Sequence, residues 1–336
     1  MESTAVPTLP LAAGLDRVIE VFDRELASDL PFVNRLTEHV RRFRGKLLRP
    51  RLLLLSGQAC GQLREAHYVL AATVEMVHMA TLVHDDVLDE ADVRRHNQTV
   101  NGLAGNEAAV MLGDYLISHA YHLCSSLDST RAARRIAAVT NTVCEGELAQ
   151  IAARCNWSLT ERDYYDIIGR KTAALTAVCC ELGAAFAGAD AELVRHMTAF
   201  GEHLGVAFQI VDDLLDLTAT QGETGKTTGR DADLGKLTLP IIRFLDTADE
   251  SRRGSMIAAL SGESTGINSG SGGNGDGHHV TQAVRDLLAG TDAIDFAMDA
   301  AAGHIRTALA HLENAPPGEA RDTLASAAEF VLQRRN

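Results

Sequence analysis

The sequence has few aromatic residues, few prolines and no excess of positive charge. Aromatic side chains make up only 4 % of the 336 residues and proline appears 7 times, whereas apolar residues reach 46 %. Alanine and leucine dominate the chain, which favours helices over strands. Lysine and arginine total 31 against 45 aspartates and glutamates, giving a net charge of −14. That sign argues against a nucleic-acid partner, so we expect an all-α protein that binds no nucleic acid.

Cysteine pairs and membrane signals are also missing. The 6 cysteines form no C-x-x-C pair and mostly stand among apolar residues, so we expect buried free thiols and a cytoplasmic protein. The N-terminus lacks a basic region followed by an apolar run, which predicts no signal peptide. The most apolar long segment, residues 68–83, is interrupted by Glu75 and His78, so we expect no membrane span.

Helical periodicity dominates the chain from about residue 8 to residue 260, with no convincing strand pattern. No linker or internal repeat divides it, so we expect a single domain over residues 1–336. Glycine and serine dominate residues 261–278, which predicts a flexible loop. Three amphipathic helices are expected beyond it, over residues 280–288, 291–313 and 317–335.

Two stretches carry the same acidic pattern, D-D-x-x-D, among apolar residues. The first contains Asp85, Asp86 and Asp89, and the second contains Asp212, Asp213 and Asp216. On a helix the first and last aspartates of each pattern lie on one side. Crowded carboxylates in an apolar setting are costly without a cation, and oxygen ligands completed by phosphate oxygens suit Mg²⁺. One such cluster could be a solvated or N-capping patch, but two copies in matching contexts favour a metal site.

Basic side chains accompany these aspartates where a negative ligand would need them. Each alone would most often be a surface charge, and Lys171 is the most suggestive because an apolar run follows it directly. The candidates are Lys46, Arg49, Arg94, Arg95, Lys171, Lys226 and Lys236. The stretch GETGKTTG at 222–229 contains Gly-Lys-Thr, as nucleotide-binding loops do. Its glycine spacing fails the P-loop pattern and it follows a helical segment, so we interpret Lys226 as a phosphate-binding residue on a lid.

The ordered motifs of the chain resemble those of the trans-type isoprenyl diphosphate synthases, also called polyprenyl synthetases. The resemblance spans roughly residues 15–245 and rests on GKLLRP, HDDVLDEADVRR, GDYL, CEGELAQ, KTAAL, FQIVDDLLD and GKTTGRDADLGKLTLP. It implies an isoprenoid-synthase-type bundle of antiparallel helices around a deep central cavity, with the two aspartate motifs facing each other across its mouth. The implied activity is condensation of isopentenyl diphosphate with farnesyl or geranylgeranyl diphosphate, with release of pyrophosphate, by a homodimer.

The resemblance also implies roles for individual residues. Three Mg²⁺ ions would be held by Asp85, Asp89 and Asp212, supported by Asp86, Asp213, Asp216 and Asp231. The allylic diphosphate would be gripped by Arg94, Lys171 and Lys226, and the allylic cation stabilised by oxygens of Thr172 and Gln209. Isopentenyl diphosphate would bind at Gly45, Lys46, Arg49, His78 and Arg95, and Lys236 completes the predicted substrate-binding residues.

Three positions depart from the family pattern. Leu47 stands where a basic residue is usual, His96 where a glycine is usual, and Leu234 where a glutamate or glutamine is usual. Since Lys46 and Arg49 remain, we expect isopentenyl diphosphate binding to be weakened or rearranged rather than lost.

The residues one and two helical turns before Asp85 bear on product length. Short-chain members of the family carry bulky aromatic residues at Ala80 or Thr81, and both are small here, with Val77 deeper along the helix. This predicts an all-trans product of about thirty carbons or more, as in quinone side chains. A geranylgeranyl or geranylfarnesyl product stays open, because Met111, Leu112 or Tyr115 could close the pocket from another helix.

Other readings of the sequence are less consistent with its motifs. A class I terpene cyclase would not need the second basic site, and a regulatory subunit would be expected to lose aspartates. A di-iron bundle needs two E-x-x-H patterns, and only Glu75-x-x-His78 is present. A dissimilar partner subunit and a peripheral membrane contact for product release stay open.

Overall fold

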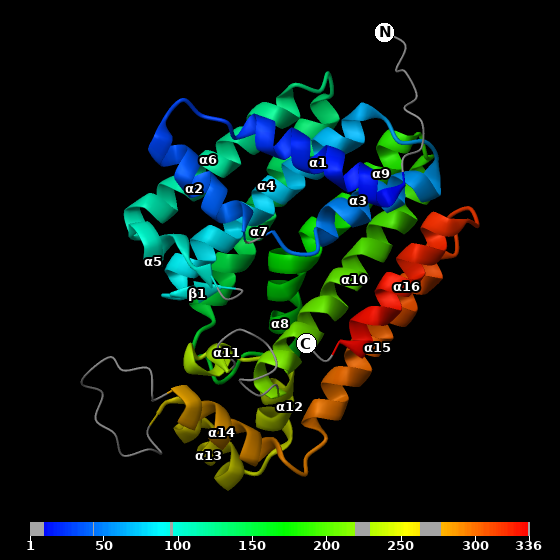
Figure 1. Ribbon diagram of the computed structural model, residues 1–336. Helices are drawn as coiled ribbons and strands as arrows, with labels where there is room; N and C mark the ends of the chain where they lie inside the picture. Colours follow the sequence, from blue (N-terminus) through cyan, green and yellow to red (C-terminus); the bar gives the residue numbers. More distant parts are fainter. Residues whose placement is uncertain (1–9, 43, 95–96, 219–228, 263–276, 335–336) are drawn as a thin grey trace. The chain divides into compact units, whose positions relative to one another are not determined.

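The computed structural model describes residues 10–42, 44–94, 97–218, 229–262 and 277–334 (Figure 1). Helices dominate these residues, which confirms the predicted all-α class. The described residues before 130 form α1 (Leu11–Glu25), α2 (Pro31–Arg41), α3 (Leu48–Cys60), α4 (Glu65–Leu88), β1 (Val93–Arg94), β2 (Asn97–Gln98), α5 (Val100–Ala104) and α6 (Asn106–Ser125). They are followed by α7 (Thr130–Ala152), α8 (Glu161–Ile168), the π-helix η1 (Gly169–Ala173), α9 (Ala174–Ala187) and α10 (Ala191–Thr218). The chain continues with α11 (Arg230–Asp233), α12 (Leu239–Thr247), α13 (Glu250–Leu260), α14 (Gly277–Leu288), α15 (Ala293–Leu312) and α16 (Glu319–Gln333).

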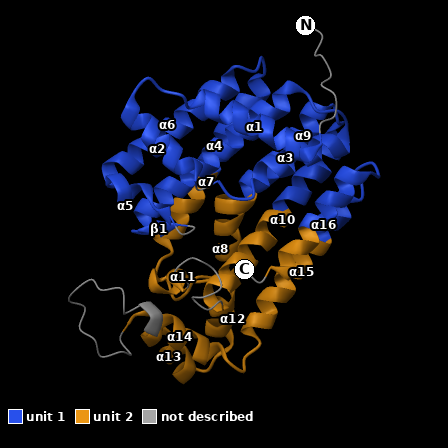
Figure 2. Ribbon diagram, viewed as in Figure 1, with its two compact units in different colours: residues 1–142, 174–202, 307–327 blue, residues 143–173, 203–306, 328–336 orange. Residues whose placement is uncertain are grey.

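The chain divides into two compact units, each assembled from separate segments (Figure 2). Unit 1 comprises residues 1–142, 174–202 and 307–327, and unit 2 comprises 143–173, 203–306 and 328–336. Four helices contribute residues to both units: α7, α10, α15 and α16. The single domain expected over residues 1–336 stays a prediction.

The core of unit 1 is built around α4, which packs against α1, α3, α6 and α9. Its interior side chains, such as Leu70, Val74 and Met76, have no accessible surface. By length and composition alone α4 could also cross a membrane, but 78 % of its most apolar window is buried inside the structure. This burial is typical of a core helix, and it explains the long apolar run without a lipid environment.

Closely packed helices in unit 1 depend on small residues at their contacts. A side chain at Gly183 of α9 would collide with the Leu53 carbonyl of α3. In α6, a side chain at Gly113 would occupy the place of the His84 imidazole. Gly113 belongs to the GDYL motif, and the structure thus gives that motif a packing role between α4 and α6.

The two short strands were not predicted from the sequence. The strands β1 (Val93–Arg94) and β2 (Asn97–Gln98) form an antiparallel ladder in which Val93 pairs with Gln98 and Arg94 with Asn97. Strands of two residues leave no alternating pattern in a sequence, so the periodicity could not indicate them.

In unit 2, α14 packs against α11, α12 and α13, and α12 also contacts α8. The three helices expected at the end of the chain are present as α14, α15 and α16. Most of the loop expected at 261–278 lies outside the described residues, and α14 begins at Gly277, inside its predicted range.

All six cysteines are free, as predicted. Cys124, Cys179 and Cys180 are buried, but Cys144 and Cys155 are exposed, so the prediction of buried thiols was wrong for these two. Cys155 lies in the turn after α7, where its backbone N–H donates to the Gly235 carbonyl and φ is 57°. Its position is therefore set by a backbone contact rather than by side-chain burial.

Candidate active site

The first aspartate motif lies at the C-terminal end of α4, in unit 1. Asp85 and Asp86 occupy the last turn, and Asp89 is the capping residue directly after it. The helix ends in a Schellman motif: Glu90 takes a left-handed conformation with φ of 51°, and the Ala91 N–H donates to the Asp86 carbonyl at 2.8 Å. Asp85 and Asp89 are half-buried, so both carboxylates keep access to a ligand.

Asp86 has a different environment from its neighbours. Its side chain is only 3 % exposed and accepts a 2.8 Å hydrogen bond from Nε of Arg94 in β1. A charged pair of this kind fixes the orientation of both groups. The structure therefore brings together two of the residues selected from the sequence and makes Asp86 the group that positions Arg94.

The residues below the first motif differ in exposure. His78 and Thr81 keep partly accessible surface on the same side of α4 as Asp85, and the Thr81 hydroxyl donates to the His78 carbonyl at 2.7 Å. Val77 and Ala80 have no accessible surface in this structure. A role for Ala80, Thr81 and Val77 in chain length stays a prediction, and Thr81 is the member of the three with accessible surface.

The GKLLRP segment precedes α3 and is strained at one residue. Leu47 has φ of 51° and ψ of 46°, a left-handed conformation that costs a residue with a Cβ about 1–2 kcal/mol. Gly45 and Lys46 are exposed and Arg49 is half-buried. The Lys46 carbonyl accepts a 2.7 Å hydrogen bond from Nε of Arg51, which holds the turn. Arg95, predicted to act with these residues, lies outside the described part of the chain, as does His96.

The second aspartate motif lies near the end of α10, in unit 2, where Asp213 is buried. Its two carboxylate oxygens accept hydrogen bonds of 2.7 Å, one from the Tyr164 hydroxyl and one from Nε2 of Gln209. Burial, and then the charge of Asp231, raise the pKa of Asp213 well above its usual value. A buried carboxyl under such repulsion is a group that a bound cation would stabilise in its ionised form.

A hydrogen-bonded chain extends from Asp213 to the π-helix η1. The Thr172 hydroxyl donates to Oε1 of Gln209 at 2.7 Å, while the amide nitrogen of Gln209 donates to Asp213. The donor and acceptor ends of Gln209 are therefore both fixed by partners, and Thr172 is positioned by a chain that ends at the aspartate motif. π-helical turns occur frequently at functional sites, and η1 contains both Lys171 and Thr172.

Asp216 caps the short segment that follows residues 219–228. Its carboxylate accepts 3.1 Å hydrogen bonds from the backbone N–H groups of Gly229 and Asp231. Burial, and then the charge of Asp231, raise the pKa of Asp216 to about 6. Lys236, which is 7 % exposed, lies 3.6 Å from the Asp231 carboxylate. Four of the predicted residues thus converge in unit 2: Asp213, Asp216, Asp231 and Lys236.

Lys171 has acidic and amide partners on α7. Its ammonium pairs with Glu147 and donates a 2.8 Å hydrogen bond to Oε1 of Gln150. The helices α7 and η1 approach closely because α7 has a glycine at their contact. A Cβ at Gly146 would lie 2.5 Å from the backbone nitrogen of Lys171. The CEGELAQ motif therefore supplies both the space and the partners for Lys171.

Asp212, predicted as a direct metal ligand, pairs with a residue near the end of the chain. Nη2 of Arg334 lies 3.2 Å from its carboxylate, and the guanidinium stacks over the Phe208 ring at 4.4 Å. The Asp212 side chain is 40 % exposed, so its carboxylate keeps access to a ligand, in contrast to the buried Asp213. Lys226, expected on the lid, lies outside the described residues.

Four functional candidates were not selected from the sequence: Glu147, Gln150, Tyr164 and Arg334. Glu147 and Gln150 stand three apart in a quoted motif, so their shared helix face was a usable signal. Tyr164 and Arg334 contact aspartates that are 49 and 122 residues away in the chain, and no local pattern marks them.

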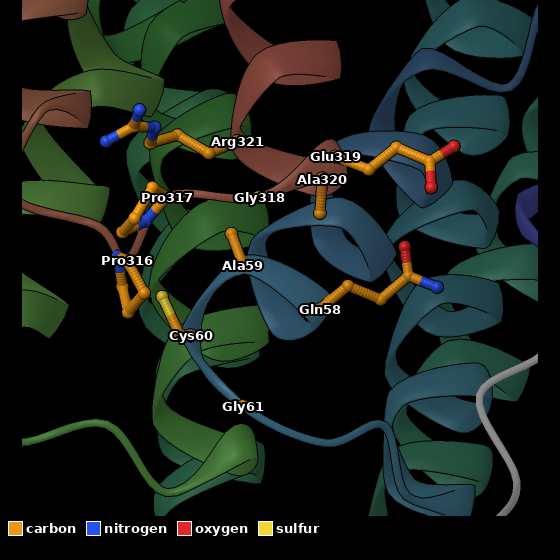
Figure 3. Close-up of a pocket in the computed structure, with 10 residues that line it drawn as sticks. All are labelled: Gln58, Ala59, Cys60, Gly61, Pro316, Pro317, Gly318, Glu319, Ala320 and Arg321. Atoms are coloured by element: carbon orange, nitrogen blue, oxygen red, sulfur yellow. The ribbon is translucent and has the colours of Figure 1, made fainter.

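A cavity of about 300 Å³ lies elsewhere in unit 1, at the end of α3 and the start of α16 (Figure 3). It is lined by Gln58–Gly61 and Pro316–Arg321, and none of these is a predicted site residue. Burial raises the pKa of the Cys60 thiol in its wall to about 11, so this cysteine is a poor nucleophile at neutral pH. The cavity gives no support to an alternative active site.

Known proteins resemble the chain over nearly its full length. The sequence pattern of the family described as Polyprenyl synthetase matches residues 31–268. Heptaprenyl diphosphate synthase component 2 from Bacillus subtilis is 34 % identical over 322 residues, covering 94 % of this chain and 88 % of the relative. The crystal structure of a decaprenyl diphosphate synthase from Rhodobacter capsulatus aligns with a TM-score of 0.86 and 34 % identity, covering 97 % of each chain.

A second solved structure is a polyprenyl synthase from Caulobacter crescentus complexed with calcium and isoprenyl diphosphate. It aligns with a TM-score of 0.88 and 30 % identity, covering 97 % of this chain and 96 % of that chain. The likeness confirms the isoprenoid-synthase fold that the motifs implied. With the ordered motifs and the family match over residues 31–268, it leads to one conclusion: the chain belongs to the polyprenyl synthetase family.

Proposed function

We propose that the chain is a Mg²⁺-dependent trans-prenyltransferase that extends an allylic diphosphate with isopentenyl diphosphate and releases pyrophosphate. It belongs among the medium- and long-chain polyprenyl diphosphate synthases, the class of its heptaprenyl and decaprenyl relatives. The hydrogen-bonded chain from Thr172 through Gln209 to Asp213 is the main support for this proposal. It joins the two oxygens assigned to the allylic cation to a carboxyl of the second aspartate motif.

The donor set fits divalent metal ions. The candidate ligands are carboxylates, which suit hard cations such as Mg²⁺. Burial and mutual repulsion raise the pKa values of Asp213 and Asp216, so a cation would relieve a cost that the fold carries. The Caulobacter crescentus structure with calcium and isoprenyl diphosphate supports the same class of ligand. We assign Asp85, Asp89 and Asp212 as the ligands of three Mg²⁺ ions, with the remaining motif aspartates and Asp231 in support.

When bound, Mg²⁺ would neutralise charge on the departing diphosphate. The chain supplies further positive charge from Arg94, Lys171 and Lys226. Asp86 orients the Arg94 guanidinium, and the Glu147–Gln150 pair holds the Lys171 ammonium at the edge of η1. One well-placed donor of this kind contributes about 3 kcal/mol to stabilising the transition state.

The oxygens of Thr172 and Gln209 act on the positive charge that develops on the prenyl group. The Thr172 hydroxyl donates to Oε1 of Gln209, so the two oxygens lie side by side, and both are electron-rich groups suited to a developing positive charge. The double bond of isopentenyl diphosphate, held by Gly45, Lys46, Arg49, His78 and Arg95, attacks the allylic C1. Loss of a proton to the released pyrophosphate then restores an allylic diphosphate that can be extended again.

We further propose a product of about thirty carbons or more, since small residues stand one turn below Asp85. Farnesyl or geranylgeranyl diphosphate is the proposed primer. We propose that the protein is a homodimer in the cytoplasm. The small side chains at Ala80 and Thr81 and the heptaprenyl and decaprenyl relatives support the long product.

The test measures the pyrophosphate released when the protein is incubated with farnesyl diphosphate and Mg²⁺. The incubation is made with and without isopentenyl diphosphate. We expect release only when both substrates are present, with several equivalents released per farnesyl group. Release of a hydrocarbon or alcohol from farnesyl diphosphate alone would instead favour a class I terpene cyclase. Release of a single equivalent, which ends at a geranylgeranyl product, would overturn the proposed length but not the transfer reaction.

A further inference from the structure

Three side chains of metal-ligand type meet at the ends of two helices in unit 1, on residues other than those assigned to prenyl transfer. Oε1 of Glu25 lies 3.1 Å from Nδ1 of His119 and 2.6 Å from Nδ1 of His122. All three ligand atoms lie within 4.8 Å of one another. Neither the family motifs nor the proposed reaction gives these residues a role.

The local fold explains why they converge. Glu25 is the last residue of α1, whereas His119 and His122 lie in the last two turns of α6. Residues three apart on a helix share one face, so both imidazoles are directed to the same side of α6. The arrangement therefore joins two separate helices through three side chains.

The geometry is suited to one small ion. Around a tetrahedral ion with ligand bonds of about 2.0–2.2 Å, ligand atoms stand roughly 3.3 Å apart. The two Glu25–histidine distances, 3.1 and 2.6 Å, are close to this separation, and a sub-ångström movement of the exposed His122 would match it. The Glu25 carboxylate is 15 % exposed and His122 is 77 % exposed, so the cluster has a half-buried side and an open side.

The surroundings support the ligand positions. The Tyr115 ring packs against the His119 imidazole with centroids 4.2 Å apart, which restricts the rotation of that ring. Fixing a ligand histidine through its neighbours is a common property of metal sites.

We propose that Glu25, His119 and His122 bind one divalent transition-metal ion, with Zn²⁺ as the reference ion and water in the open position. Two imidazoles and one carboxylate form a donor set that is typical of zinc and its neighbours, whereas the aspartate motifs offer only the oxygen ligands that Mg²⁺ prefers. The two kinds of site therefore select different ions. The bound ion would link the end of α1 to the end of α6. Its role would be structural and independent of prenyl transfer.

Two ions serve as probes on the full chain without an affinity tag. Binding of Co²⁺ is measured by its visible absorption, and binding of Zn²⁺ by calorimetry. Excess Mg²⁺ is present throughout to occupy the aspartate motifs. We expect one equivalent of Co²⁺ with the spectrum of a tetrahedral nitrogen and oxygen site, and a higher melting temperature with Zn²⁺, because the ion binds the folded state only.

Two variants assign the ion to the cluster. His122→Gln changes the exposed ligand and Glu25→Gln a half-buried one. Each is expected to weaken binding at least tenfold and to abolish the Zn²⁺-dependent rise in melting temperature. His39→Gln, on α2, is the matched control and is expected to bind as the unchanged chain does. Binding of equal strength in His122→Gln, or no ion bound in the presence of Mg²⁺, would overturn the proposal. Because His122 is largely exposed, its replacement is expected to leave the fold intact.

Discussion

The phenol of Tyr164 donates a 2.7 Å hydrogen bond to Oδ2 of Asp213, the buried carboxyl of the second aspartate motif. Tyr164 lies in α8, one turn before the π-helix that contains Lys171 and Thr172. Burial, and then the charge of Asp213, raise the pKa of this tyrosine well above its usual value, so the phenol remains a donor across the working pH range. The motif aspartate is therefore held by a residue from a different helix.

Replacing Tyr164 by phenylalanine is expected to destabilise the protein by about 1–3 kcal/mol, because a buried acceptor loses its donor. The same change is expected to alter the Mg²⁺ concentration needed for half-maximal activity, since Asp213 would be less well positioned. Chemical denaturation and a Mg²⁺ titration of activity measure the two effects. Tyr165→Phe, at the neighbouring half-buried position, is the control and is expected to change the Mg²⁺ dependence little. Identical effects of both changes would contradict a specific role for Tyr164.

Gly146 is expected to be intolerant of alanine, because a Cβ there would lie 2.5 Å from the backbone nitrogen of Lys171. Relief of this overlap must move α7 or η1, at a cost of about 1–3 kcal/mol in stability. A displacement of about 1 Å at Lys171 and Thr172 is expected to lower kcat/KM by roughly 100-fold.

The control for Gly146→Ala is Gly254→Ala in α13, where a Cβ would meet no atom within 4 Å. Alanine at this open helical position is expected to stabilise the protein by up to about 1 kcal/mol and to leave kcat/KM unchanged. Steady-state kinetics and thermal unfolding of both variants provide the comparison. Full activity of Gly146→Ala would show that the contact between α7 and η1 does not position the site.

Thr81→Phe is expected to shorten the product. Thr81 is partly accessible one turn before Asp85, so an aromatic ring there would obstruct the path of a growing prenyl chain. Thr81→Ser keeps the small size and the hydroxyl and should give the original product. Sizing of the dephosphorylated products by mass distinguishes these outcomes, and an unchanged length in Thr81→Phe would place the determinant on another helix.

Acid pH is expected to destabilise the fold through His304. Its Nδ1 lies 2.9 Å from Nδ1 of His203, and burial, then the charge of His203, lower the pKa of His304. Because the unfolded chain then binds a proton more readily than the folded one, the stabilisation is present above about pH 6.5 and is lost as the pH falls through the folded-state pKa. Urea unfolding at pH 7.5 and pH 5.5 should show a smaller difference for His304→Gln than for the unchanged chain. An equal difference in both proteins would exclude this source of pH dependence.

Local pattern was sufficient to predict the helices and the residues of both aspartate motifs. Apolar periodicity predicted a mainly helical chain over residues 8–260, and the D-D-x-x-D spacing marked Asp85 and Asp212 as candidate metal-site residues. The same pattern could not distinguish the buried member of each trio, because the burial of Asp86 and Asp213 depends on Arg94 and Tyr164, which approach from other elements.

Contacts distant in sequence account for most of what could not be predicted. Arg334 pairs with Asp212 across 122 residues, and η1 is an irregularity that helical periodicity does not reveal. The role of Gly146 could not be predicted for the same reason. The need for glycine within a helix depends on how closely a neighbouring backbone approaches it. Sequence patterns thus indicated the candidate residues of the site, whereas the packed structure shows which other side chains position them.

The activity proposed for this chain is the repeated extension of an allylic diphosphate. The most direct measurement is the mass of the polyprenyl alcohol recovered after incubation with farnesyl diphosphate, isopentenyl diphosphate and Mg²⁺, followed by removal of the diphosphate. We predict a main product of about thirty carbons or more. The absence of any condensation product, with both substrates and Mg²⁺ supplied, would exclude prenyl transfer by this chain.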